Sequence, residues 1–122
     1  MIILICGSRT KYDVIKTEEE LQAVIKENYK ETFIHGGAVG VDSQADKALK
    51  ILLPDYSNQV KIFRPQYDAY GKYAPIHRDK AMVQMSDFIL AFWNTESPGP
   101  KFVIQYAELL SKRIKMIDVK LV

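Results

Sequence analysis

The chain of 122 residues has only one cysteine and two histidines, and these scarcities exclude several classes of protein. A single cysteine, Cys6, forms no internal disulfide, which we expect of a protein in the reducing cytoplasm. One cysteine and two distant histidines do not provide the ligands of a zinc site, so no metal is predicted. No apolar run approaches the roughly 18 residues of a membrane span, and the first residues lack the features of a signal peptide. We therefore expect no membrane partner.

The chain also lacks a large excess of charge of either sign. The net charge is only +2, and the 17 lysines and arginines are scattered rather than grouped. Nucleic-acid binders usually carry a basic patch or stripe, so the sequence argues against nucleic acid as the main partner. The hydrophobic fraction of 48% is ordinary for a globular protein. A chain of this length holds one core but not two, which predicts a single domain over residues 1–122.

Apolar and amphipathic segments alternate along the chain. The apolar runs predict five strands, at Ile2–Cys6, Thr32–His35, Gln59–Phe63, Phe88–Trp93 and Lys115–Val119. The amphipathic segments predict four helices: from Asp13 to near Tyr29, from the glycine-rich loop to before Pro54, about Ala74–Met85, and after Pro98-Gly99-Pro100. This alternation is typical of an α/β fold, here a three-layer Rossmann-like domain with a mostly parallel five-stranded sheet and helices on both faces. The irregular stretch Arg64–Tyr73 is predicted to form a long loop after a strand.

A glycine-rich loop joins the second strand to the second helix. Gly36, Gly37 and Gly40 lie between His35 and Asp42. Glycines leave backbone N–H groups accessible, and a helix N-terminus attracts anions, so Gly36, Gly37, Ala38, Gly40 and Val41 are predicted to bind a phosphate. The alternative is a tight turn that only lets the helix pack. Asp42 either caps this helix or accepts hydrogen bonds from a ribose or a base. We expect His35 to be a buried, hydrogen-bonded histidine rather than a catalytic one.

Polar residues follow the other strands as well, and parallel strands bring their carboxyl ends to one edge of the sheet. Arg9 and Arg78 are predicted to balance the charge of a phosphate. Ser8 and Ser97, together with Asp42, are predicted to orient a ribose. The remaining predicted ligand-binding residues in these segments are Gly7, Asp79 and Gly99. Tyr67, Tyr70 and Tyr73 either stack on a base or form a packed lid.

Four segments resemble motifs of the SLOG superfamily, in the same order along the chain: Ile5–Arg9, His35–Asp42, Ala74–Asp79 and Asp87–Trp93. The resemblance is greatest to the small YspA-like branch, found in bacteria and phages. The superfamily also includes the DNA-processing protein DprA and the LOG phosphoribohydrolases. The resemblance implies a Rossmann-like fold and a site for a nucleotide or a nucleotide-derived ligand, such as NAD or ADP-ribose, in a bacterial or phage cytoplasm.

The chain departs from the LOG enzymes at their motif Pro-Gly-Gly-x-Gly-Thr-x-x-Glu. Gly99 matches the last glycine, but Pro100 replaces the threonine and Val103 stands where the glutamate should be. Asp79 stands where relatives often have asparagine. The catalytic residues are therefore not assigned. The leading hypothesis is a protein that binds a nucleotide-derived ligand as a sensor or a processor.

Two other functions stay open at this point. One is an N-glycosidase or phosphoribohydrolase-like enzyme with an unusual acid, Glu96 or Asp42. The other is a DprA-like single-stranded DNA-binding module. By analogy with other Rossmann-like domains, a homo-oligomer is compatible with this fold.

Overall fold

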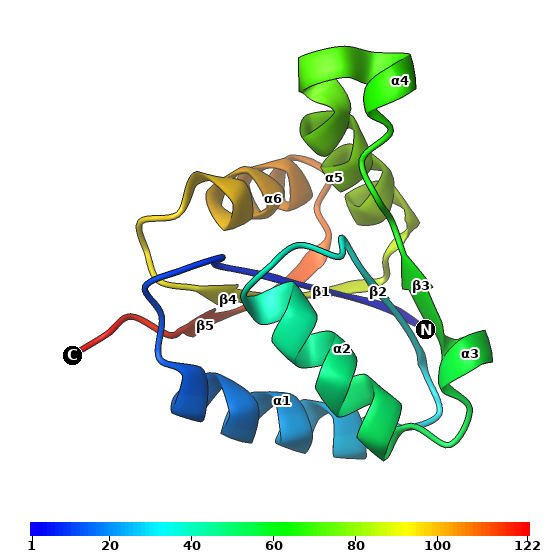
Figure 1. Cartoon of the computed structure of the whole chain (residues 1–122), viewed down its shortest axis with the longest axis vertical. Helices are drawn as coiled ribbons and strands as arrows, with labels where there is room; N and C mark the ends of the chain where they lie inside the picture. The colour runs from blue at the N-terminus through cyan, green and yellow to red at the C-terminus, as the bar shows by residue number, and fades with distance from the viewer.

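The computed structural model describes residues 1–122 and has a five-stranded sheet between two layers of helices (Figure 1). The strands are β1 (Ile2–Gly7), β2 (Thr32–His35), β3 (Val60–Ile62), β4 (Phe88–Trp93) and β5 (Arg113–Asp118). Their order in the sheet is β3-β2-β1-β4-β5, and every neighbouring pair is parallel. The predicted fold class is confirmed. β5 begins two residues earlier than predicted because Arg113 already pairs with Phe88 of β4.

Each face of the sheet is covered by two helices. Side chains alternate along a strand, so Ile3 and Ile5 of β1 face one core while Leu4 and Cys6 face the other. The helices α1 (Val14–Glu27) and α2 (Val41–Leu52) pack on the first face. The helices α5 (Ala74–Met85) and α6 (Pro98–Leu109) pack on the second face. None of the helices has both the length and the apolarity needed to cross a membrane.

The start of α6 differs from the sequence prediction. The helix begins at Pro98 rather than after Pro100. Proline is tolerated in the first helical turn, where its missing N–H would have no partner in any case. The extended conformation of Ser97 marks the true N-cap. As a result, Gly99 lies within the first turn of α6.

The stretch Arg64–Tyr73 is more ordered than predicted. It contains a short helix, α4 (Tyr67–Tyr70), followed by the 3-10 turn η1 (Gly71–Tyr73). These turns form an arm that projects beyond the sheet and continues into α5 (Figure 1). Another short helix, α3 (Tyr56–Gln59), precedes β3.

The strand order reverses at β1, which has β2 on one side and β4 on the other. In open α/β sheets, ligands bind at this switch point, outside the carboxyl ends of the strands. Here the loop after β1 lies tightly against the start of α2, since the Val41 N–H donates to the carbonyl oxygen of Ser8 at 3.1 Å. Gly40 has a φ of +82°, and a Cβ on it would lie 2.5 Å from the Ser8 oxygen. Glycine at this position therefore lets the two segments approach each other.

Candidate functional site

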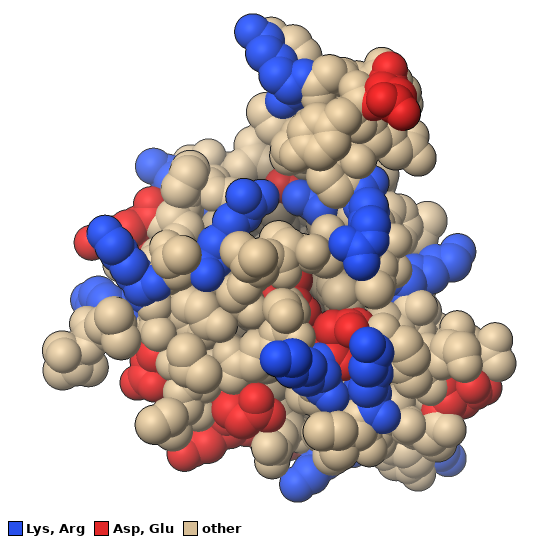
Figure 2. All heavy atoms as spheres, viewed as in Figure 1, with Lys and Arg blue, Asp and Glu red and all other residues tan.

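A pocket of about 610 Å³ opens at the switch point. This volume falls within the range of about 300–1,000 Å³ that is usual for small-molecule sites. Its walls come from the loop after β1, the glycine-rich loop with the start of α2, the inner face of α5 and the first turns of α6. Figure 2 shows a hollow below the projecting arm, with Lys and Arg atoms around it. The predicted convergence of strand ends on one edge is therefore seen.

Eight of the thirteen predicted binding residues line this pocket: Gly7, Arg9, Ala38, Asp42, Arg78, Asp79, Ser97 and Gly99. The other five do not line it: Ser8, Gly36, Gly37, Gly40 and Val41. Val41, the first residue of α2, is fully buried in the core on the side of the sheet that α1 and α2 cover. The glycine-rich loop thus contributes less of the pocket surface than its sequence suggests.

Asp42 holds the glycine-rich loop in place. Its Oδ2 accepts hydrogen bonds from the N–H groups of Gly36 and Ala38, both at 3.2 Å. The anion in the loop is thus a carboxylate of the protein itself. The Asp42 side chain is buried, and its Oδ1 is enclosed without any hydrogen-bond partner. Burial raises the pKa of Asp42, against the opposing effects of the Ala38 N–H and of the nearby His35 and Arg78.

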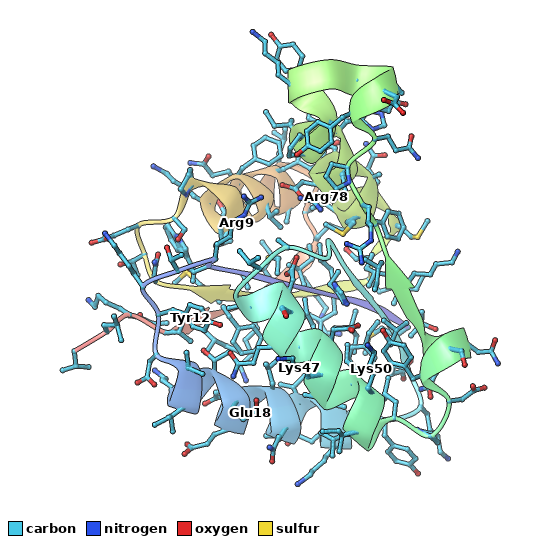
Figure 3. The ribbon with its side chains drawn as sticks, viewed as in Figure 1. Arg9, Tyr12, Glu18, Lys47, Lys50 and Arg78 are labelled. Carbon is cyan, nitrogen blue, oxygen red and sulfur yellow. The ribbon has the colours of Figure 1, made fainter.

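Arg78 fixes the same loop from the other side (Figure 3). Its Nη1 donates to the carbonyl oxygens of Gly36, at 2.6 Å, and of Phe63, at 3.1 Å. Its Nε donates to Asp79 Oδ1 at 2.7 Å. A side chain on Gly36 would collide with the guanidinium. Arg78, predicted to balance a phosphate, is therefore already paired and only 8% exposed.

Arg9 is the cation in the pocket that has no partner. Its side chain is exposed, lies beside α6 in Figure 3, and makes no hydrogen bond or ion pair. It lies close enough to Asp79 to lower the pKa of that carboxyl, although burial raises this pKa overall. No protein group accepts from the backbone N–H groups of Thr10 and Gly99, which also belong to the pocket wall. Hydrogen-bond donors are thus available beside the loop after β1 and the start of α6.

Asn94 organises the site, although no role was predicted for it from the sequence. It is buried and links the two loops at the switch point. Its Nδ2 donates to the carbonyl oxygens of Thr10 and Lys11, and its Oδ1 accepts from Ser97 Oγ. The Asn94 N–H donates to Ser8 Oγ at 2.9 Å. The hydroxyls of Ser8 and Ser97, predicted to orient a ribose, are therefore engaged within the protein. The signal in the sequence was an asparagine directly after a buried strand.

His35 is buried as predicted, with 1% exposure. Its Nδ1 accepts from the Gly37 N–H at 3.0 Å, so the ring proton lies on Nε2, which faces Asp46 Oδ1 at 2.9 Å. Burial tends to raise the pKa of Asp46, but hydrogen bonds from Tyr56, His35 and Lys50 outweigh it and lower the pKa. Burial and Asp46 together raise the pKa of Tyr56 to about 12. This cluster supports the loop from outside the pocket.

The apolar part of the pocket was not predicted either. It is formed by Cys6, Pro75, Ile76, Met82, Pro98, Pro100, Phe102 and Val103. Burial raises the pKa of the Cys6 thiol well above its ordinary value, which suits packing rather than reactivity. In the sequence these residues look like core or turn residues, and only the tertiary structure exposes one side of them to a pocket.

No protein-family model and no curated protein sequence matches the chain. Among solved structures, it is similar to DNA processing protein A from Helicobacter pylori, with a TM-score of 0.75 and 16% identity over 99% of this chain. The chain covers 66% of that protein, which is slightly less than two thirds. It is also similar to the molybdenum cofactor carrier protein MCP from Chlamydomonas reinhardtii, with a TM-score of 0.66 and 23% identity. That match covers 94% of this chain and 74% of the carrier protein.

These likenesses concern the fold. The chain has a DprA-like Rossmann fold. Membership of the YspA-like branch stays a prediction from the sequence.

The different surroundings of the two arginines lead to a first prediction. Replacing Arg78 with methionine leaves two carbonyl oxygens and Asp79 without their donor, and we expect it to lower the free energy of unfolding by about 3 kcal/mol. Replacing the exposed, unpaired Arg9 with methionine should change it by less than about 0.5 kcal/mol. Urea unfolding at neutral pH measures both. Equal losses in the two variants would contradict this account of the loop.

The pKa of Asp42 predicts a particular pH dependence. Because its pKa is raised, the native state keeps the proton to higher pH than the unfolded state, where the pKa is near 3.8. The contribution of Asp42 to the free energy of unfolding therefore falls as the pH rises from the pKa of the unfolded state through the higher pKa of the native state. Asp42→Asn retains an acceptor for the loop and does not titrate. Urea unfolding at several pH values should show this variant gaining stability relative to the unmodified protein over that window. A constant or falling difference would exclude a raised pKa.

Proposed function

We propose that the pocket binds a nucleotide or a nucleotide-derived ligand of the NAD or ADP-ribose kind, which the protein senses or processes. The observation that carries this proposal is the separation of polar groups in the pocket. Asp42 lines the pocket, and its enclosed Oδ1 has no donor within the protein. Donors that lack acceptors lie at Arg9, Thr10 and Gly99. A ligand with sugar hydroxyls, an anionic phosphate and a flat apolar base is complementary to both groups and to the apolar wall.

In this proposal a ribose hydroxyl donates to Asp42 Oδ1. An unsatisfied buried polar atom costs about 1–3 kcal/mol, so a hydroxyl at this position recovers that energy on binding. A phosphate at the same place would meet a carboxylate instead. It would also have to displace Oδ2 from the N–H groups of Gly36 and Ala38. The glycine-rich loop is therefore a poorer phosphate site than the sequence suggests.

The phosphate is better placed near Arg9 and the first turn of α6. A charged guanidinium forms strong, paired hydrogen bonds with phosphate oxygens. The free N–H groups of Thr10 and Gly99 add donors, and the N-terminal end of α6 carries a partial positive charge. The base then lies against the apolar wall, where Met82, Phe102 and Val103 are available. Pockets for cofactors usually combine such walls with a few well-placed polar groups.

The two structural neighbours are consistent with a ligand-binding role for this fold. One is described as binding single-stranded DNA and the other as carrying the molybdenum cofactor. The net charge of +2 gives this chain little general attraction for a polyanion. We therefore place a small nucleotide-derived ligand ahead of single-stranded DNA.

A second candidate function is cleavage of an N-glycosidic bond. Its support is that the carboxyls of Asp42 and Asp79 both line the pocket and both have a pKa raised by burial, as a general acid requires. Val103 lines the pocket at the position of the LOG glutamate and supplies no acid. Glu96 is exposed and lies outside the pocket wall. Any acid would thus be Asp42 or Asp79.

Isothermal titration calorimetry with ADP-ribose, AMP and NAD tests the leading proposal. We expect binding to the unmodified protein and about tenfold weaker binding to Arg9→Met, since one charge-assisted hydrogen bond is worth roughly 1.4 kcal/mol or more. Asp42→Asn, which places an amide donor at the position of Oδ1, should weaken binding by a similar factor. The control Lys47→Met removes an exposed charge from α2, outside the pocket, and should bind normally. No binding of any of these ligands, or equal effects in Arg9→Met and Lys47→Met, would refute the proposal.

Chromatography separates binding from cleavage. After incubation with the protein, we expect AMP and ADP-ribose to be recovered intact. Release of free adenine that is lost in Asp42→Asn or Asp79→Asn would instead establish the second candidate and exclude a purely binding role.

A further inference from the structure

A second pocket shares one lining residue with the first. It has a volume of about 480 Å³ and lies between the projecting arm and α5. The arm supplies Ala69, Tyr70 and Tyr73, and α5 supplies Ile76, His77 and Lys80. Ile76 also lines the pocket at the switch point. The two pockets therefore share Ile76 in their walls, and a ligand that occupied both would pass this residue.

The second pocket is aromatic. The rings of Tyr70 and His77 are stacked, with their centroids 3.6 Å apart and an angle of 18° between their planes. The Tyr73 side chain is 62% exposed, with Lys72 Nζ 5.3 Å from its ring centroid. Exposed aromatic rings with cations beside them provide stacking surfaces for bases. Packing within the chain does not account for the exposure of Tyr73.

The unpaired cation of the first pocket, Arg9, lines the same pocket as Ile76, the residue that the two pockets share. Arg9 is close enough to Asp79 to lower the pKa of that carboxyl, and Asp79 follows Ile76 by three residues, which is one turn of α5. Arg9 and Ile76 both line the first pocket. Lys80, the residue after Asp79, lines the second pocket. Phosphates that pass between the two pockets would lie near these cations.

We propose that the second pocket receives the second base of a dinucleotide in which two nucleosides are joined by a pyrophosphate. The inference rests on the proposed function, because the first nucleoside occupies the pocket at the switch point. The pyrophosphate passes Arg9 and Ile76, and the second base stacks on Tyr73 and on the Tyr70–His77 pair. The protein is thus selective for dinucleotides over mononucleotides. The size of the paired pockets and the small net charge favour such a ligand over a DNA strand.

Calorimetric titrations with diadenosine pyrophosphate and ADP-ribose test the inference, because these ligands differ only in the second adenine. We expect the unmodified protein to bind diadenosine pyrophosphate about tenfold more tightly, in line with the contribution of one stacked base. Tyr73→Ala should remove this preference and leave the affinity for ADP-ribose unchanged, while Tyr73→Phe should retain it. The matched control is Tyr67→Ala, which removes an exposed tyrosine of the same arm that does not line the pocket and should retain the preference.

The outcomes separate the inference from the function on which it rests. If neither ligand binds, the inference fails, and if AMP and NAD do not bind either, the proposed function fails with it. If both bind with equal affinity, or if Tyr67→Ala and Tyr73→Ala weaken binding alike, only the inference is overturned. A parallel titration with oligothymidylate completes the test. Strand binding that depends on Tyr73, without a preference for diadenosine pyrophosphate, would overturn the inference in favour of nucleic acid.

Discussion

The arrangement of the pocket depends on the contact between Asp42 Oδ2 and the N–H groups of Gly36 and Ala38. Such closely spaced amides at the start of a helix attract an anion, and here the chain supplies its own. Arg78 completes the constraint by binding the Gly36 carbonyl oxygen and tying it to α5. The loop is therefore held from both sides before any ligand arrives. The cost is a buried carboxylate with one unsatisfied oxygen, and its raised pKa reflects that cost.

This constraint decides how charge is distributed around the pocket. The carboxyl groups of the pocket are those of Asp42 and Asp79. The guanidinium of Arg78 is paired within the protein, with Asp79 and with the Gly36 carbonyl oxygen. The unused positive charge is on Arg9, next to the free N–H groups of Thr10 and Gly99. A ligand must therefore direct its donors toward α2 and its anionic part toward α6. The strand order β3-β2-β1-β4-β5 places these two sides across the switch point, so the fold and the electrostatics specify the same orientation.

Hydrophobic periodicity was sufficient to predict the sheet and its main helices, because continuous apolar runs and amphipathic segments reflect burial directly. The glycine-rich loop, Arg9 and Gly99 were assigned to one edge of the sheet on the same basis, and the structure brings them together. What local pattern could not provide was the partner of each polar group. The side chains of Ser8 and Arg78 form hydrogen bonds with segments far away in sequence, whereas Asp42 Oδ2 and Ser97 Oγ are engaged within or beside their own loops. The role of Asn94 also depends on contacts between distant segments, while the aromatic pocket depends on how the arm folds against the adjoining helix α5.

The central claim is that a ligand phosphate binds beside Arg9 and α6 while Asp42 keeps the amides of the glycine-rich loop. Backbone amide chemical shifts report both places in one titration of the ¹⁵N-labelled protein with ADP-ribose. The account predicts that the Thr10 and Gly99 amides shift most and that those of Gly36 and Ala38 change little, since these two remain bonded to Asp42. Large shifts at Gly36 and Ala38, with Thr10 and Gly99 unchanged, would show that the phosphate displaces Asp42 and would contradict the account.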